Sequence, residues 1–542
     1  MLLYNSDDLE AKKKMKREDL IAPLQYNLVS EIERYATQEG KVAVKWIGQD
    51  NETKEMTYQA LMTAANQMGN VFLEQGLKKG DVVLIIIPRL IEAYQVYLAA
   101  LKIGLVVIPS SEMLRTKDLQ YRISHGEVKA VISYYPYISE FEPIKEMDQM
   151  TKFVIGQECD GWIQLEERAK QASHELSVAD TRSGDMAFLS YTSGTTGNPK
   201  AVVHTHAWAY AHLRTAAPNW LCINEGDTVW ATAGPGWMKW IWSPFLAVLG
   251  SGATGLSYHG KFEPEKYLEL LKKFEVNVLC CTPTEYRLMA KVDHLENYDL
   301  SSLHSAVSAG EPLNREVIEI FYKNFNLKVR DGYGQTENTL LVGITKDIDL
   351  KPGSMGKPTP GNHVEIINDA GEPCAIGEVG DIAVHRNTPA LFKEYFKEPE
   401  RTAKQYRGEY YVTGDRAKKD EEGYFWFEGR GDDIIISSGY TIGPFEVEDA
   451  LVKHPYVKEC AVVASPDRDR GNVVKAFIVL KDDIKENLAD LAIVLQKHVK
   501  EMTAPYKYPR KIEFVHQLPK TNSGKIRRVE LRNKELGIGR KD

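Results

Sequence analysis

Short apolar runs alternate with amphipathic stretches along most of the chain. Residues 82–87 read Val-Val-Leu-Ile-Ile-Ile, and residues 90–102 follow with the apolar spacing of a helix. Continuous β-branched runs separated by helices are typical of parallel strands that are covered on both faces. The pattern therefore predicts an α/β fold with a large N-terminal domain of stacked, mostly parallel sheets. Further strands are expected at the apolar runs 105–108, 128–133, 187–191, 276–281, 302–308 and 327–330.

The pattern changes near residue 360. Glycine, proline and other turn residues crowd residues 351–380, which predicts antiparallel hairpins in a β-rich subdomain. After residue 433 an α+β pattern follows on a smaller scale, with helices near 446–453 and 486–501 and strands at 459–464, 473–480 and 511–515. We therefore divide the chain into an N-terminal domain, 1–431, and a small mobile C-terminal domain, 432–542.

Composition narrows the class of protein. Of the 542 residues, 43% are hydrophobic, which is typical of a globular protein. The formal net charge of −8 argues against a nucleic-acid binder. The longest uncharged stretch, 240–258, is interrupted by Pro244 and three glycines, so we expect a buried strand and loop there rather than a membrane span. The N-terminus lacks the apolar core of a secretory signal, and the six cysteines are scattered, which predicts a cytoplasmic protein without structural zinc.

The strongest chemical signal is the loop Tyr191-Thr-Ser-Gly-Thr-Thr-Gly-Asn-Pro-Lys200. Glycines allow a phosphate to approach the backbone, hydroxyl and amide groups donate to its oxygens, and the lysine adds a compact charge. The spacing differs from the Walker A loop, in which the lysine directly follows the second glycine. A flexible surface turn is the alternative interpretation.

This loop resembles the phosphate-binding signature of the adenylate-forming (ANL) superfamily, which includes acyl- and aryl-CoA synthetases, luciferases and peptide-synthetase adenylation domains. Further motifs resemble that family in its order, over nearly the whole chain. The resemblance assigns the nucleotide's phosphates to Thr192, Ser193, Gly194, Thr195, Thr196, Gly197 and Lys200. It assigns the remaining nucleotide contacts to Gly310, Glu311 and Pro312 along the adenine and to the segment Asp331, Gly332, Tyr333, Gln335 and Thr336, with Thr336 on the α-phosphate.

The same resemblance supplies the metal, ribose and catalytic positions. Glu337 corresponds to the magnesium ligand, and a carboxylate is the oxygen donor that this ion prefers. Asp415 and Arg430 correspond to the ribose contacts, where a carboxylate can accept two hydrogen bonds from a diol. Lys525 corresponds to the catalytic lysine of the first half-reaction, where a point charge can act on the carboxylate and the α-phosphate.

The resemblance implies an AMP-forming acyl-CoA synthetase that uses ATP, Mg2+ and CoA. The acid and ATP would give an acyl-adenylate and diphosphate, and CoA would then replace AMP. Between the two steps the small domain would rotate about Asp432, and the pantetheine would pass Gly439. Thr441 departs from the family, which often has Arg or Lys there, so a charge that could help hold phosphate is missing.

Two features bear on the acid. Acetate-specific relatives carry a tryptophan at the position of Gly334, so glycine there predicts room for a medium-chain or short branched-chain acid. Trp237 is a candidate wall of the same pocket, although the tryptophans of residues 237–242 could equally pack in the core. For Lys239, within the same segment, we expect a surface lysine whose ammonium reaches the solvent.

Other functions remain open at this point. A carrier-protein thiol could replace CoA, the acid could be aromatic, and a luciferase-like oxygenase shares the adenylation half. A non-catalytic adenylate-binding protein is a further alternative, but Lys200, Glu337, Asp415, Arg430 and Lys525 are all present. The expected partners are small molecules, with no nucleic acid and no integral membrane segment, and the sequence leaves an oligomer open.

Overall fold

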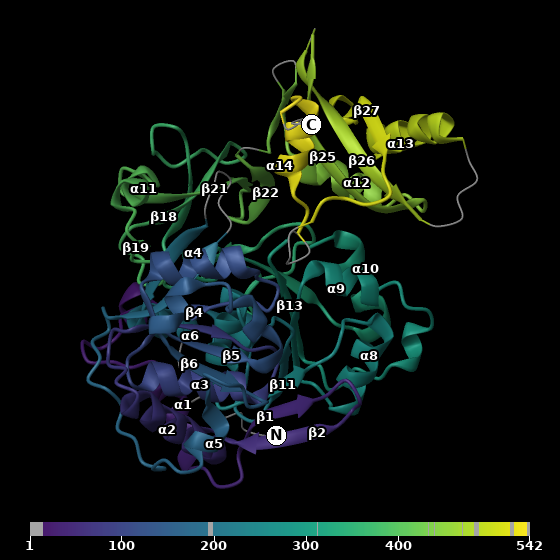
Figure 1. The fold of residues 1–542 in the computed structure, drawn as a ribbon. Helices are drawn as coiled ribbons and strands as arrows, with labels where there is room; N and C mark the ends of the chain where they lie inside the picture. The colour runs from purple at the N-terminus through teal and green to yellow at the C-terminus, as the bar shows by residue number, and fades with distance from the viewer. Residues whose placement is uncertain are drawn as a thin grey trace, which may run out of the picture.

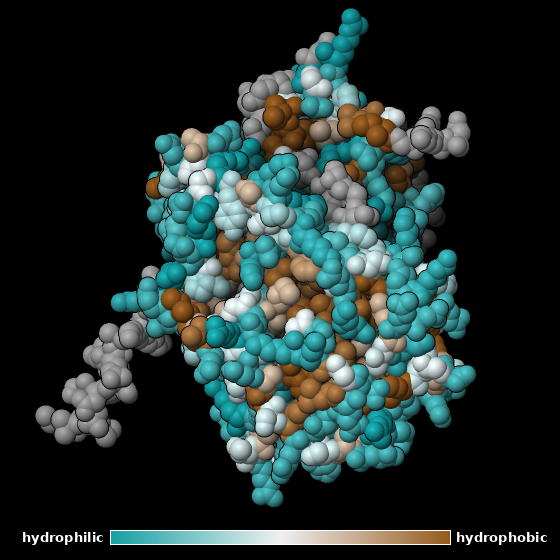
Figure 2. All heavy atoms as spheres, turned by 60° about the vertical axis from the view of Figure 1, so that its left-hand side comes forward, coloured by the Kyte–Doolittle hydropathy of each residue, from teal (hydrophilic) through white to brown (hydrophobic). Residues whose placement is uncertain are grey.

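The computed structural model describes residues 15–192, 199–311, 313–431, 433–437, 440–468, 470–481, 487–520 and 525–538. Two large, mostly parallel sheets and their helices build the main body, and the last hundred residues form a smaller unit beside it (Figure 1). This mixed α/β architecture confirms the predicted fold class. Hydrophilic side chains cover most of the face seen in Figure 2, and hydrophobic ones gather near its middle.

The first large sheet is parallel in its centre, and antiparallel strands close both edges. Strands β13 and β14 therefore end at the same edge of the sheet, with Ala309 paired to Gly332. From one edge to the other the strands are β16 (Lys357–Pro358), β15 (Val342–Gly343), β14 (Val329–Tyr333), β13 (Ser305–Ala309), β12 (Val278–Cys281), β10 (Thr228–Ala231), β11 (Thr254–Tyr258), β1 (Val42–Ile47) and β2 (Thr53–Thr57).

The second large sheet contains the apolar run at 82–86, all five residues of which are buried. Its strands are β19 (Glu394–Tyr395), β9 (Lys200–Thr205), β8 (Met186–Thr192), β4 (Val106–Pro109), β3 (Val82–Ile86), β5 (Val128–Tyr134), β6 (Thr151–Ile155) and β7 (Ile163–Gln164). Strands β8 and β9 are antiparallel, and Thr192 pairs with Lys200. The two ends of the predicted phosphate loop are therefore held side by side.

One apolar core lies between the two sheets. It takes Val44 from β1 and Val83 from β3, together with residues of several helices, of which four are the longest. These helices are α2 (Tyr58–Glu74), α3 (Ile91–Lys102), α6 (His206–Ala216) and the π-helix η6 (Ile241–Leu249). The other α-helices of the main body are α1 (Ser30–Glu33), α4 (Thr116–Gly126), α5 (Leu165–Ala169), α7 (Met238–Trp240), α8 (Pro264–Lys273), α9 (Pro283–Met289), α10 (Arg315–Phe325) and α11 (Pro399–Lys404).

The prediction for residues 240–258 is wrong in its first half. Residues 241–249 are helical, and only β11 is a strand. All nine residues of η6 are buried, so the segment is apolar on every side and has no helical pattern of polar positions. A short apolar run of this kind cannot be distinguished from a buried strand by its periodicity. No helix of the described residues is long and apolar enough to cross a membrane.

A five-stranded antiparallel sheet follows the main body, which confirms the predicted hairpins. Its strands are β17 (Val364–Ile367), β18 (Val379–His385), β20 (Tyr406–Arg407), β21 (Tyr410–Lys419) and β22 (Phe425–Arg430). Strands β21 and β22 place Arg430 directly opposite Asp415. The two residues that the sequence assigns to ribose thus face the same place.

The small C-terminal unit has its own core. A short hairpin, β23 (Ile435–Ser437) and β24 (Tyr440–Ile442), leads into it. Its main elements are α12 (Pro444–Val452), β25 (Val457–Asp467), β26 (Gly471–Leu480), α13 (Leu488–Met502), β27 (Lys511–Phe514) and α14 (Arg528–Glu535). These elements confirm the predicted α+β pattern to within a few residues.

Candidate active site

Lys200 and Glu337 form an ion pair at the start of β9. Lys200 Nζ lies 2.8 Å from Glu337 Oε1 and donates to the hydroxyl of Tyr395 at 2.8 Å. The Tyr395 hydroxyl in turn donates to Glu337 Oε1 at 2.8 Å, and burial followed by the Glu337 charge raises the pKa of Tyr395. The cation and the carboxylate neutralise each other, so either could exchange its partner for a phosphate oxygen or a metal ion.

Asp415 is the centre of a second polar cluster. Its Oδ2 accepts a hydrogen bond from the hydroxyl of Tyr333 at 2.6 Å and another from Gln335 Nε2 at 2.7 Å. Asp415 is 7% exposed, and Arg430 lies opposite it on β22. Tyr333 and Gln335 come from one predicted motif and Arg430 from another, and all three lie next to the Asp415 carboxylate. The hydrogen bonds from Tyr333 and Gln335 help to fix its position.

Asp331 lies on β14 just before Tyr333. Burial raises the pKa of its carboxyl to about 8, although backbone N–H groups of Gly332 and Leu313 donate to it and act in the opposite direction. A side chain at Gly332 would collide with the Trp220 ring, which lies 2.6 Å from the position of a Cβ atom. This residue must be glycine for the indole to pack against the strand.

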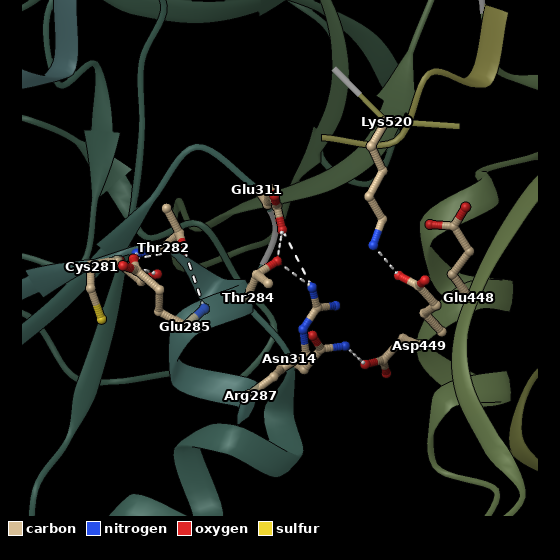
Figure 3. Close-up of polar contacts among 12 residues, drawn as sticks. Cys281, Thr282, Thr284, Glu285, Arg287, Glu311, Asn314, Glu448, Asp449 and Lys520 are labelled. Carbon is tan, nitrogen blue, oxygen red and sulfur yellow. Dashed lines mark hydrogen bonds and ion pairs between the residues drawn. The ribbon is translucent and has the colours of Figure 1, made fainter. Parts of the chain in front are cut away.

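The segment after β13 carries Gly310 and Glu311. Gly310 has φ +106°, a backbone conformation that favours glycine. Thr284 Oγ1 donates to Glu311 Oε2 at 3.0 Å, and Arg287 Nη2 donates to Thr284 Oγ1 at 2.7 Å (Figure 3). The first turn of α9 therefore fixes the carboxylate of Glu311.

Lys525 reaches this segment from the small domain. Its Nζ lies 3.9 Å from the position that a Cβ atom would take at Gly310. The residue as a whole is exposed, but burial of its ammonium lowers the pKa of Lys525. The charge of Arg430 also lowers this pKa, whereas the charges of Glu311 and Asp415 raise it. The structure thus brings together residues from the adenine, ribose and C-terminal motifs.

Three aromatic residues that the sequence analysis missed hold the loop that carries Thr336 and Glu337. His204 Nε2 donates to the Thr336 carbonyl, Trp208 Nε1 donates to the Asn338 carbonyl at 2.9 Å, and His212 Nδ1 bonds the Thr339 hydroxyl at 2.7 Å. Burial lowers the pKa of His204 to about 4 and that of His212 to about 3. The sequence signal was the spacing of four residues between Trp208 and His212, which places both side chains on one face of α6, whereas His204 lies on β9 and gave no such signal.

Two residues of α4 hold the ends of the phosphate loop, and the sequence analysis missed these as well. His125 Nδ1 lies 2.9 Å from the Tyr191 hydroxyl, and the Tyr121 hydroxyl donates to the Pro199 carbonyl at 3.2 Å. The rings of Tyr121 and His125 stack at 5.3 Å. One helix face thus fixes both strands next to the loop.

Lys239 differs from its prediction. It lies at the acyl end of the site, which we define as Trp220, Lys239, Trp242 and Gly334. Its ammonium is shielded from solvent, has no hydrogen-bond partner among the described residues, and lies 4.9 Å from the Trp220 ring centroid and 5.5 Å from that of Trp242. The expected surface lysine is therefore wrong. The two indole faces attract the cation, which offsets part of the cost of removing it from water.

Gly334 lies against the indole of Trp242. A Cβ atom at residue 334 would lie 2.9 Å from Cη2 of Trp242 and 2.0 Å from the backbone oxygen of Thr339. A tryptophan at residue 334 would therefore require this loop to move. The predicted wall residue Trp237 is 37% exposed, whereas Trp240 and Trp242 both belong to the buried core, so two of the three tryptophans have the alternative role of core packing.

The other predicted residues lie at the edge of the described parts of the chain or outside them. Thr192 ends β8, and its hydroxyl is buried without a hydrogen-bond partner among the described residues. Ser193, Gly194, Thr195, Thr196, Gly197, Pro312, Asp432 and Gly439 lie outside the described residues. Within the described part of the chain, no three His, Cys, Asp or Glu side chains form a group that could hold a metal ion.

Comparison with known proteins identifies the family. The AMP-binding enzyme family model matches residues 32–396, and the model of the AMP-binding enzyme C-terminal domain matches residues 446–525. Two solved structures have closely similar folds. The anthranilate CoA ligase AuaEII in complex with anthranoyl-AMP superposes with a TM-score of 0.88 at 29% identity, covering 96% of this chain and 99% of that one. ATP-bound MatB from Rhodopseudomonas palustris gives 0.84 at 26% identity, covering 94% and 99%.

Relatives identified by sequence agree. The uncharacterized acyl-CoA ligase YtcI of Bacillus subtilis (strain 168) is 64% identical over 96% of this chain and 98% of its own length. The mitochondrial acyl-coenzyme A synthetase ACSM3 of Mus musculus is 41% identical over 90% of this chain and 86% of its own. The chain therefore belongs to the AMP-binding enzyme family and, within it, to the acyl-CoA ligases.

Proposed function

We propose that this ligase activates a short branched-chain or medium-chain carboxylic acid, and that the predicted residues act in the roles that their geometry supports. The observation that carries the proposal is the position of Lys525. Its ammonium lies beside Gly310, where Glu311 and the Asp415–Arg430 pair also face. A cation at this place is suited to the adenylation step, in which negative charge must be held between a carboxylate and a phosphate.

In that step a carboxylate oxygen of the acid attacks the α-phosphorus of ATP, and diphosphate leaves. Asp415 would accept hydrogen bonds from the ribose hydroxyls, and Lys200 would exchange Glu337 for a phosphate oxygen. Thr336 would contact the α-phosphate, and His204 holds the carbonyl of this residue in place. These groups align the two reactants and neutralise charge, which are the main contributions that a protein makes to such a transfer.

Magnesium would bind at Glu337. The carboxylate is buried and faces Lys200, which is a suitable partner for a phosphate that shares the metal. Because the described residues offer no cluster of metal ligands, phosphate and water oxygens would complete the coordination. The ion would supply positive charge to the phosphates.

Thioester formation would use the same site after the small domain has moved. The proposed hinge at Asp432 and the pantetheine contact at Gly439 rest on the family resemblance. The thiolate sulfur of CoA would attack the acyl carbon, and AMP would leave. A cytoplasmic location is also part of the proposal, and its support is that all six cysteines are free thiols.

The acid's tail would lie at the acyl end. The indoles of Trp220 and Trp242 are 1% and 6% exposed in this structure, so they would have to shift to admit the tail, and Lys239 beside them would place a charge where a longer chain would continue. Burying methylene groups against an ammonium is unfavourable, which favours short or branched acids over long ones. The unpartnered ammonium also favours a second candidate, an acid whose far end carries a hydroxyl or carboxylate that could bond Lys239.

The test is an assay of diphosphate release with and without CoA over acetate, isobutyrate, 2-methylbutyrate, hexanoate, decanoate, benzoate, 3-hydroxybutyrate and succinate. We expect the highest turnover with isobutyrate, 2-methylbutyrate or hexanoate, and an acyl-CoA product by mass spectrometry. Preference for 3-hydroxybutyrate or succinate would support the second candidate. Acid-dependent diphosphate release that never yields an acyl-CoA would contradict thioester formation.

A further inference from the structure

A hydrogen bond joins the two domains beside the site. Asn314 Nδ2, in the large domain, donates to Asp449 Oδ1 on α12 of the small domain at 3.1 Å (Figure 3). Asn314 is 5% exposed, and Lys453 Nζ lies 3.0 Å from the other oxygen of Asp449. The hydrogen bond is therefore shielded from solvent, and Lys453 partly neutralises the charge of the Asp449 carboxylate.

Asn314 is also the N-cap residue of α10. Its φ of −71° and ψ of 139° are those of a normal N-cap, and asparagine is among the residues preferred there because its side-chain oxygen accepts from the first turn. In this structure it makes no such bond, and its Oδ1 is buried without a partner in the described part of the chain. The side chain has been diverted from its own helix to the other domain, which leaves one acceptor unsatisfied.

The helix that receives this bond also holds the segment of the catalytic lysine. Glu448, next to Asp449, forms a two-pronged ion pair with Arg528, whose Nη2 lies 2.7 Å from Oε2. Arg528 follows Lys525 by three residues, and Lys520, before it, pairs with Glu459 of β25 at 2.7 Å. Through α12, the position of Asn314 is therefore coupled to the position of Lys525.

In the large domain, Asn314 is also close to the place that Lys525 approaches. Asn314 follows Gly310 by four residues, and Gly310 is the place that the Lys525 ammonium approaches. Elsewhere at the junction like charges face each other. The pKa of Lys291 is lowered by burial and then by Lys481, which belongs to the small domain. The junction thus combines repulsion at Lys291 with attraction of Lys525 by Glu311 and Asp415, and the directed bond of Asn314 adds to this balance.

We infer that Asn314 is a positioning residue with two alternative partners. Bound to Asp449, it holds the small domain where Lys525 serves adenylation. When that domain moves away, the side chain turns back and caps α10, so the orphaned oxygen regains a partner and the loss of the interdomain bond is offset. The inference rests on the proposed two-step reaction and adds to it a residue that balances the two arrangements.

The test uses Asn314→Asp, Asp449→Asn and the double variant. Aspartate at residue 314 still caps α10 but repels Asp449, so single-turnover formation of acyl-adenylate should fall roughly tenfold, near the low end of couplings between two sites. Conversion of supplied acyl-adenylate and CoA should stay unchanged or become faster. In the double variant the amide of residue 449 can donate to the carboxylate of residue 314, so adenylation should recover.

The control is Asn324→Asp, which adds the same charge at an exposed position of α10. Full adenylation by Asn314→Asp, an equal loss in both half-reactions, or failure of the double variant to recover would overturn the inference. The same four variants are also compared by urea unfolding, where the double-mutant cycle should show coupling between residues 314 and 449. If the wild type adenylates no acid, the proposed function fails while this cycle still measures the contact.

Discussion

The two ends of the site are built differently. At the nucleotide end, charged side chains have polar partners, as Lys200 has Glu337 and as Asp415 has Tyr333 and Gln335. At the acyl end, the Lys239 ammonium lies against two indoles and has no hydrogen-bond partner within the residues that the structure describes. A nucleotide can replace these polar partners one for one, whereas an acid would contact apolar side chains and the single charge of Lys239. We infer that the chemistry is set at the first end and the choice of acid at the second.

The largest expected effect is on the nucleotide side. Lys525→Ala removes the ammonium beside Gly310, so the adenylation rate should fall about 100-fold or more, the usual loss when one group that stabilises developing charge is removed. Thioester formation from supplied acyl-adenylate should be nearly unchanged, which rapid-quench assays of each half-reaction can measure. Lys497→Ala, which removes an exposed lysine of α13, is the control and should retain adenylation. An equal loss in both half-reactions would contradict the separation of roles.

A smaller effect is expected at the ion pair. Glu337→Gln leaves Lys200 without its counter-charge and removes the proposed metal ligand, so kcat/KM for ATP should fall about 30-fold or more. The relative kcat/KM values for different acids should stay the same, because the acyl end is untouched. Steady-state kinetics with ATP and with two acids check this. A changed acid preference would show that the two ends are not independent.

The buried histidines predict a pH effect on stability. The folded pKa values of His204 and His212 are about 4 and about 3, below the ordinary value of 6.5. Between about pH 4 and pH 6.5 the unfolded chain therefore binds more protons at these histidines than the folded chain does. The free energy of unfolding should therefore fall as the pH drops from about 6.5 to 4. Urea unfolding at pH 7.5, 5.5 and 4.5 measures the slope, and His212→Gln should reduce the slope below pH 6.5 by about 1.4 kcal/mol per pH unit. An unchanged slope in the variant would mean that His212 does not stay neutral in the fold.

The nucleotide end could be predicted from the sequence because its residues stand in contiguous motifs. Asp415 and Arg430, for example, could be assigned as a pair before the hairpin of β21 and β22 placed them opposite each other. The supporting residues could not, because His204, Trp208 and His212 act on a loop more than a hundred residues away. Lys239 was misjudged for a related reason. The sequence shows a lysine among tryptophans but not that Trp220, from another segment, closes over its ammonium.

The most direct test of the central claim is the substitution Lys239→Leu, with selectivity and ATP kinetics measured together. Leucine replaces the charge with apolar volume, so kcat/KM for hexanoate relative to isobutyrate should rise about tenfold, the value of two further methylene groups in an apolar environment. The KM for ATP should stay within about twofold, because Lys200, Glu337 and Asp415 are unaffected. An unchanged ratio of the two acids, or an equal loss for both together with a raised KM for ATP, would contradict the account.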